Sequence, residues 1–368
     1  MSGTEAVERR VTWAELFFDL VFVFAALQAS ELLHDDHGWP GVARAVIVFV
    51  PLYWAWVHVA IHANTHDVDT TAGRLGILAT ALCGLLVAMA IPQAYGERGM
   101  FFAVVYLVMR LVIVVTASRG DRRVLPTSIT AAVVAGPLMV VGAFTEGTAR
   151  ELIWAAAMLI ALAAPAVDRK RLALIRFDHA HLAERFGLFV TIAFGESLID
   201  VGLAAAKAPH LDAALVTAVV VAFVLACGLW WLYYTFAIGA YERAVHTARV
   251  QTDAVRRNLA YAHLPLVGSV FAVAVGLADV VAHPTHHLPL GAAALLLGGV
   301  ALYLATLAFT LWPTARGTSA GCLAAAAVVM ALLPAATRIP ALAALAALAA
   351  VVAGLNAREG RRRRADRD

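Results

Sequence analysis

The chain of 368 residues has few charged residues and few cysteines. Only 14% of its residues are charged and 62% are hydrophobic, whereas about 25% charged residues is usual for soluble domains. The three cysteines lie far apart within apolar stretches and predict neither a disulfide nor a paired-cysteine metal site. The sequence also lacks a phosphate-binding glycine-rich loop and a Ser/His/Asp order, so soluble-type enzymology has no basis in it and we expect no cofactor.

Long hydrophobic runs are the main feature of the chain. The first run follows Arg9 and Arg10 without a small-residue cleavage site, which indicates a membrane helix and not a cleaved signal. The predicted fold class is all-α, a polytopic integral membrane protein of about twelve transmembrane helices. Their expected ranges are 12–33, 42–63, 74–95, 100–118, 124–144, 151–167, 181–204, 211–238, 259–281, 289–312, 318–335 and 340–355.

Basic residues are concentrated on one side of the predicted spans. Most of the 28 lysines and arginines fall near the N-terminus, in every second loop or in the C-terminal tail 356–368. The positive-inside rule then places both termini in the cytoplasm and requires an even number of spans. Arg361–Arg364 are expected near anionic headgroups, and no nucleic-acid role is expected because no folded basic domain accompanies them.

Several polar and aromatic blocks resemble the bacterial low temperature requirement A (LtrA) family. They are Glu15-Leu-Phe-Phe-Asp19-Leu-Val-Phe-Val, Ala63-Asn64-Thr-His-Asp67-Val-Asp69, the segment from His181 through Glu184-Arg185 to Gly195-Glu196-Ser197, Trp230-Trp231-Leu-Tyr233-Tyr234, and Tyr261-Ala-His263-Leu-Pro265-Leu. They run in the family's order over about residues 11–280. The resemblance implies a multi-pass protein of the bacterial inner membrane and a set of residues, but no reaction.

The two acid-bearing segments, around Glu15 and around Glu184, also suggest an internal duplication. Aligning them predicts two parallel six-helix halves, 12–167 and 181–355. The segment 168–180 would then be a cytoplasmic linker.

Ionisable side chains inside apolar segments mark the candidate site, because a charge in hydrocarbon persists mainly where it is paired, hydrated or used. Glu15 and Asp19 share one helix face. In the seventh helix His181, Arg185 and Glu196 fall within one sector, with Glu184 beside it and Ser197 next to Glu196. Glu196 is expected deepest in the membrane, with Arg185 as its partner or as an anion clamp.

Three functional interpretations of this polar core remain open. The leading one is a proton- or ion-coupled transporter or permeation protein in which Glu196 is the coupled carboxylate and His181 and His263 relay protons. The second is a membrane sensor or accessory protein whose buried network only fixes helix register. The third is an intramembrane enzyme acting on lipid. The expected partners are the bilayer, a small solute or ion such as the proton, and, as an option, a second copy of the chain.

Two groups of histidines are weaker metal candidates. His58, His62 and His66 stand four residues apart on one predicted helix, a spacing that can bind zinc; the alternative is that only His58 lies at depth. Asn64 and Asp67 are expected to cap helix ends or face a vestibule. On the opposite side, His34-Asp-Asp-His37 and His283-Pro-Thr-His-His287 either approach each other to bind metal or sense pH, or are solvated loops.

Overall fold

A computed structural model describes residues 11–119, 123 and 125–365. The described residues form helices joined by short loops, with no strand and one isolated bridge between His287 and Pro340. The elements are α1 (Trp13–Asp35), α2 (Trp39–Thr65), α3 (Thr71–Ala90), η1 (Ile91–Gln93), α4 (Gly99–Ala117), α5 (Leu125–Thr130), η2 (Ala131–Ala135), α6 (Gly136–Ala143), α7 (Gly147–Val167), α8 (Arg169–Leu172), α9 (His179–Ala206), α10 (Ala213–Leu232), η3 (Tyr233–Ala237), α11 (Ile238–His246), α12 (Gln251–Ala254), η4 (Val255–Tyr261), α13 (His263–Ala282), α14 (Leu290–Leu311), α15 (Arg316–Ala336) and α16 (Ala341–Ala365). The segments η2, η3 and η4 have π-helical geometry; η2 and η3 run directly into the α-helices on both sides, and Ala262 separates η4 from α13.

Within the described residues, twelve helical segments are long and apolar enough to cross a membrane, which confirms the predicted all-α membrane fold. The two longest spans have 34 residues (Ala213–His246) and 32 residues (Gln251–Ala282), and both exceed their predicted ranges. The segment 239–258, which lies between two of the predicted spans, is therefore mostly helical. The basic run 361–364 is helical too, as the continuation of α16.

Polar side chains fix several helix starts. The Thr70 hydroxyl accepts from the amide of Gly73 at the start of α3, and Asp212 accepts from Leu215 at the start of α10. Each bond satisfies one of the amides that a helix leaves unpaired at its beginning.

The chain divides into two compact units that interleave along the sequence. Unit 1 contains residues 1–29, 46–189 and 242–260, and unit 2 contains residues 30–45, 190–241 and 261–368. These units differ from the sequential halves predicted above, and the duplication remains a prediction.

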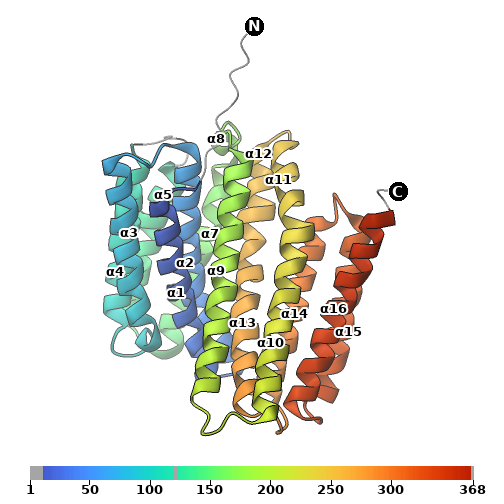
Figure 1. The fold of residues 1–368 in the computed structure, drawn as a ribbon. Coiled ribbons are helices and arrows are strands. Elements are labelled where there is room, and N and C mark those ends of the chain that lie inside the picture. Colours follow the sequence, from blue (N-terminus) through green and yellow to red (C-terminus); the bar gives the residue numbers. More distant parts are fainter. Residues whose placement is uncertain (1–10, 120–122, 124, 366–368) are drawn as a thin grey trace. The chain divides into compact units, whose positions relative to one another are not determined.

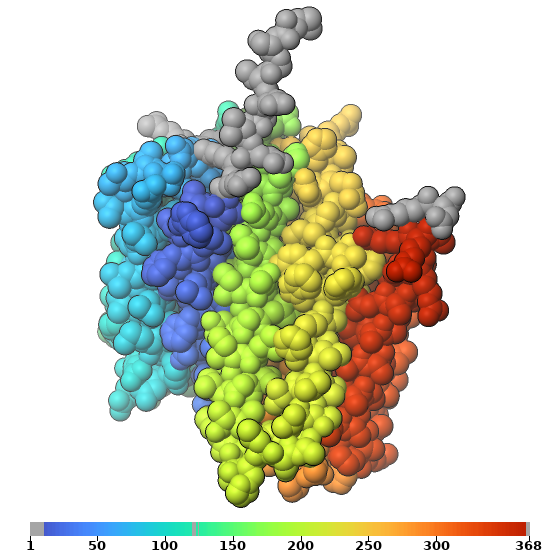
Figure 2. Space-filling view, viewed as in Figure 1, coloured from blue at the N-terminus to red at the C-terminus, as the bar shows by residue number. Residues whose placement is uncertain are grey.

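Unit 1 contains α3–α8 with parts of α1, α2 and α9. Helices α3 and α4 pack side by side (Figure 1). Gly84 of α3 touches the ring of Phe22, so closely that an added Cβ would lie 2.8 Å from it. The outer face of α3, light blue in Figure 2, exposes Leu75, Leu78, Leu82 and Met89, as suits contact with lipid.

Unit 2 is built around α14, which packs against α13 and α15. Helix α10 packs against α16, where Gly228 contacts Val352 and its carbonyl accepts a hydrogen bond from Asn356 at 3.0 Å. Ser319 of α15 donates to the carbonyl of Ala308 at 2.6 Å. Small residues and backbone-directed hydrogen bonds are how membrane helices pack closely without a hydrophobic driving force between them.

Candidate functional site

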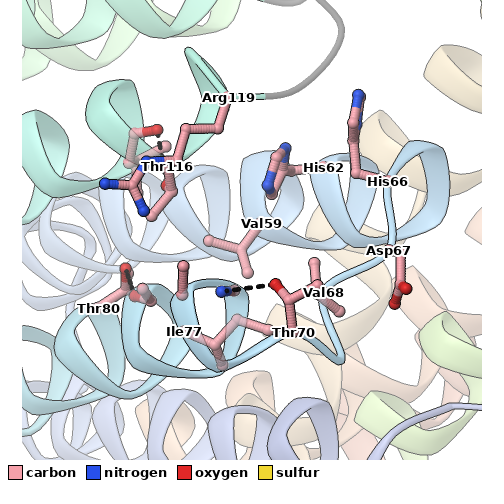
Figure 3. Close-up of a pocket in the computed structure, with 14 residues that line it drawn as sticks. Val59, His62, His66, Asp67, Val68, Thr70, Ile77, Thr80, Thr116 and Arg119 are labelled. Carbon is pink, nitrogen blue, oxygen red and sulfur yellow. Dashed lines mark hydrogen bonds between the residues drawn. The ribbon is translucent and has the colours of Figure 1, made fainter.

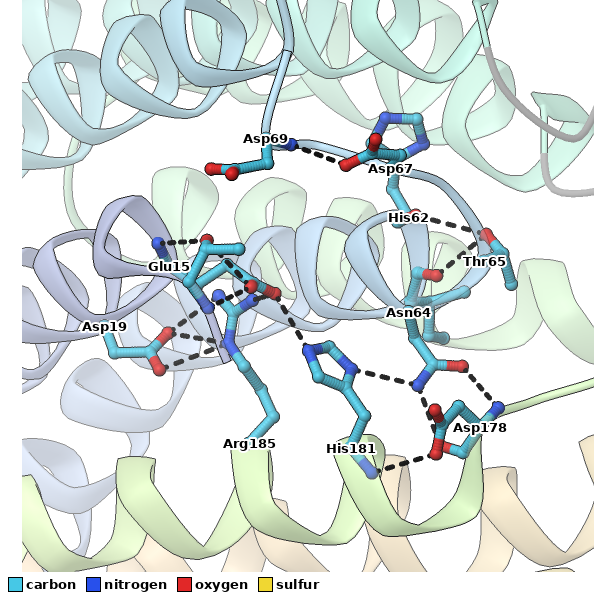
Figure 4. A network of polar contacts seen from close by, with 12 residues as sticks. Glu15, Asp19, His62, Asn64, Thr65, Asp67, Asp69, Asp178, His181 and Arg185 are labelled. Atoms are coloured by element: carbon cyan, nitrogen blue, oxygen red, sulfur yellow. Dashed lines mark hydrogen bonds and ion pairs between the residues drawn. The ribbon is translucent and has the colours of Figure 1, made fainter. Parts of the chain in front are cut away.

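A buried ion cluster lies in unit 1, where the first turns of α1 and α9 meet (Figure 4). Arg185 of α9 directs all three guanidinium nitrogens at two carboxylates of α1. Its Nη1 pairs with Glu15, its Nη2 lies 2.9 Å from Asp19 Oδ1, and its Nε lies 3.2 Å from both Asp19 oxygens. The three side chains are 0–1% exposed. Each guanidinium nitrogen is therefore paired with a carboxylate in a buried environment.

Aromatic rings enclose this ion cluster. The Arg185 guanidinium carbon lies 5.8 Å from the ring centre of Phe18 and 6.0 Å from that of Trp56. The Trp56 indole also donates to Asp19 Oδ1 at 2.7 Å. Tryptophan thus supplies both apolar cover and a hydrogen bond to the carboxylate.

A hydrogen-bonded chain runs from the ion cluster toward the loop before α9. His181 Nε2 lies 3.5 Å from Glu15 Oε1, and His181 Nδ1 lies 3.1 Å from the Asn64 amide nitrogen. The Asn64 amide is oriented by the backbone of Asp178, because its oxygen accepts from the Asp178 amide and its nitrogen donates to the Asp178 carbonyl. Since the Asn64 nitrogen can only donate, neutral His181 carries its proton on Nε2, facing Glu15.

Side chains beside the ion cluster cap the starts of both α1 and α9. Thr12 and Glu15 form a capping box, in which the Thr12 amide donates to Glu15 Oε2 at 2.8 Å and the Glu15 amide donates to the Thr12 hydroxyl at 3.3 Å. Asp178 accepts from the His181 amide at 3.1 Å. The positive ends of two helix dipoles therefore lie beside the carboxylates and stabilise their charge.

A pocket of about 260 Å³ lies on the other side of the last turn of α2, also in unit 1 (Figure 3). His62, His66 and Asp67 line it together with Thr70 of the α2–α3 loop and Arg119 after α4. His62 and His66 stack with ring centres 5.1 Å apart. Asn64 lies between these two histidines in sequence, so the same helix end contributes to both the pocket and the ion cluster.

Comparison with known proteins settles the family. The model of the family described as "Bacterial low temperature requirement A protein (LtrA)" matches residues 10–357. The chain belongs to the LtrA family. It is also 32% identical over 326 residues to "Uncharacterized protein RA0937" of Rhizobium meliloti (strain 1021), a match that covers 83% of this chain and 77% of the relative. No solved structure matches the chain.

Among the LtrA-like residues, Glu184, Glu196 and Ser197 do not join the ion cluster. Glu184 is exposed. The predicted Arg185–Glu196 pair does not form, because the two residues are separated by eleven positions of one helix, about 16 Å along its axis. Glu196 is half-buried within unit 2, and Ser197 donates to the carbonyl of Ala193 in its own helix at 2.8 Å. Arg185 and Glu196 share one face of α9, but the rise of the helix keeps them apart.

The weak metal candidates His58, His62 and His66 do not form a group with metal-compatible spacing among the described residues, where the group of three or more His, Cys, Asp or Glu side chains with such spacing lies elsewhere. His58 is buried and donates from Nδ1 to the Trp54 carbonyl at 2.7 Å. Asp67 is exposed at the pocket and accepts from the amide of Asp69.

His263 is buried in unit 2, where its Nε2 lies 2.7 Å from the Tyr233 hydroxyl of η3. A π-helical turn offsets the backbone register and leaves carbonyls with weakened partners. In unit 1, Tyr53 uses such carbonyls in η4, since its hydroxyl donates to Ala260 at 2.8 Å.

Arg110 is the charged residue whose environment the sequence did not reveal. It lies in the middle of α4, is 0% exposed, and none of its three nitrogens has a hydrogen-bond partner within the described part of the chain. The ring centre of Tyr106 lies 5.8 Å away, which gives partial compensation by a cation–π contact. Hydropathy places Arg110 inside a span, and the structure adds that it forms no ion pair with a carboxylate of the described residues.

Proposed function

We propose that this LtrA-family protein is a proton-coupled transport or permeation protein of the bacterial inner membrane, with both termini in the cytoplasm. The ion cluster of Glu15, Asp19 and Arg185 is its proton-binding site. One observation carries the proposal: two carboxylates share a single guanidinium where exposure is at most 2%, so the ionised cluster with neutral His181 keeps one excess negative charge.

An excess charge in a buried site is costly, and binding a proton or a small cation removes it. His181 supplies a path for a proton, because its Nε2–H points at Glu15 and its Nδ1 can be reprotonated from the side of Asn64. A proton on His181 Nδ1 would face the amide protons of Asn64, so these two donors can no longer form a hydrogen bond. Proton uptake therefore breaks the contact that connects α9 to α2.

The last turn of α2 couples this event to the pocket. Asn64 faces the ion cluster, and His62 and His66 face the cavity. A shift of this turn when Asn64 releases His181 changes the pocket wall. The pocket, lined by histidines and Arg119, is accordingly the proposed solute site.

The proposal is tested by proton flux into liposomes that contain the purified protein and a trapped pH-sensitive dye. A potassium diffusion potential, negative inside, should drive proton entry above the rate of empty liposomes. Asp19→Asn and His181→Gln should reduce the flux at least about 10-fold, because the first removes the excess negative charge that binds the proton and the second interrupts the relay. Glu184→Gln is the matched control on the same helix turn and should leave the flux unchanged, because Glu184 is exposed.

A membrane sensor or accessory protein is the second candidate, and the complete pairing of Arg185 favours it. A sensor predicts no proton flux, but a pH-dependent thermal stability that Asp19→Asn abolishes. Wild-type liposomes that are no more proton-permeable than empty ones would overturn the transport proposal in favour of this one.

A further inference from the structure

A group of metal-ligating side chains in unit 2 takes no part in the ion cluster. His34 lies in the last turn of α1, His37 in the turn before α2, and Asp279 in the last turn of α13, all within unit 2. One ligand atom from each lies within 4.8 Å of the others. We propose that these three residues bind a divalent transition-metal ion of the zinc class.

The distances suit zinc. Zinc binds histidine nitrogen and carboxylate oxygen at about 2.0–2.2 Å, so neighbouring ligands of a tetrahedral site lie about 3.3 Å apart. His37 Nε2 and Asp279 Oδ2 are 3.4 Å apart. Both atoms are buried and neither makes a hydrogen bond within the described chain, although both side chains remain more than a quarter exposed. An ion can thus reach two ligand atoms that have no other polar partner.

The chemistry of the donors selects the ion. Two imidazoles and one carboxylate are typical zinc ligands, whereas magnesium and calcium prefer oxygen ligands alone. Neutral histidines with one carboxylate leave a net charge of +1 on the bound site. Three protein ligands also leave the fourth position of a tetrahedron for water or an exogenous ligand.

Packing holds the ligands in place. A single buried cluster contains Leu33, Ala45, Val275 and Leu295. Leu33 directly precedes His34, and Val275 lies one helical turn before Asp279. Gly291 at the start of α14 lies against His37, so that an added Cβ would stand 2.4 Å from the Cβ of His37. A side chain at position 291 would therefore displace the His37 ligand without touching the other two.

The test is titration of the purified, detergent-solubilised protein with Zn²⁺ by calorimetry and with Co²⁺ by visible absorption. The wild type should bind one ion and give the intense absorption of tetrahedral cobalt. His37→Ala and Asp279→Asn should weaken binding at least about 100-fold, since each removes one of three ligands. Gly291→Ala, which changes no ligand, should weaken binding by about 10-fold.

The matched control is His286→Ala/His287→Ala, which removes two exposed histidines of the nearby loop. This control should bind like the wild type. Equal loss in the control, unchanged binding in His37→Ala, or the absence of wild-type binding would each overturn the site. A thermal melt without metal verifies that every variant is folded, and Asp279→Asn, which keeps the side-chain shape, remains informative if His37→Ala does not fold.

Discussion

Two of the buried arginines of unit 1, Arg185 and Arg110, lie in opposite electrostatic environments. Arg185 reaches two carboxylates and two aromatic rings, whereas Arg110 reaches the ring of Tyr106 and no carboxylate in the described chain. Both are 0% exposed. Burial alone therefore does not distinguish an arginine that holds helices together from one that strains them. The difference lies in the charges that neighbouring helices supply.

The largest expected effect is the loss of Arg185. Arg185→Met leaves Glu15 and Asp19 buried side by side without a counter-ion, so the free energy of unfolding should fall by about 3–5 kcal/mol. Denaturant unfolding in mixed micelles measures this change. The exposed Arg249 provides the control, and Arg249→Met should change stability by less than about 0.5 kcal/mol. A similar small loss for Arg185→Met would show that the cluster contributes little.

The same substitution at Arg110 should have the opposite sign. Arg110→Met removes a buried charge that has no carboxylate partner and fills the space with an apolar side chain of similar length. The free energy of unfolding should rise by about 1–4 kcal/mol, measured in the same way. A decrease would break the comparison, because it would mean that Arg110 has a stabilising partner outside the described residues.

Asp19→Asn sharpens the comparison through coupling. In the wild type it weakens the bonds to Arg185 and Trp56 and should cost about 1–3 kcal/mol. In the Arg185→Met background the same change removes an orphaned charge and should instead restore stability. A double-mutant cycle measures the difference, and simple additivity of the two substitutions would refute the direct pairing.

The smallest expected effect is at the edge of the cluster. Asn64→Ala removes the amide that joins His181 to Asp178 and should cost about 0.5–2 kcal/mol. Thr65→Ala is the neighbouring control, because the Thr65 hydroxyl donates only to carbonyls of its own helix. Thermal melts of the two variants should separate them, with the larger shift for Asn64→Ala.

Hydropathy predicted the spans well because each must match the thickness of a bilayer in one stretch of chain. The acids of α1 and Arg185 were also predictable, since charges within apolar runs are rare. Their partners were not, because pairing depends on which helices pack together. Glu196 shows this limit, as it shares a face with Arg185 but lies about 16 Å along the helix.

Two local patterns in the sequence also predict helix caps at the site. Thr12-Trp13-Ala14-Glu15 has the spacing of a capping box, which predicts that Glu15 also binds the chain start. Asp178 precedes His181 by three residues, as an N-cap does. The missing ion-pair partner of Arg110 has no such local pattern, because it depends on which side chains the neighbouring helices place beside it.

The capping box connects the ionisation of Glu15 to the first turn of α1. Glu15 gives one oxygen to Thr12 and the other to Arg185 and His181, so a proton that reaches its carboxyl group also loosens the first turn of α1. Trp13 lies in that turn and is 88% exposed. A change in the ionisation of Glu15, which is 1% exposed, is therefore expected to move a tryptophan at the surface.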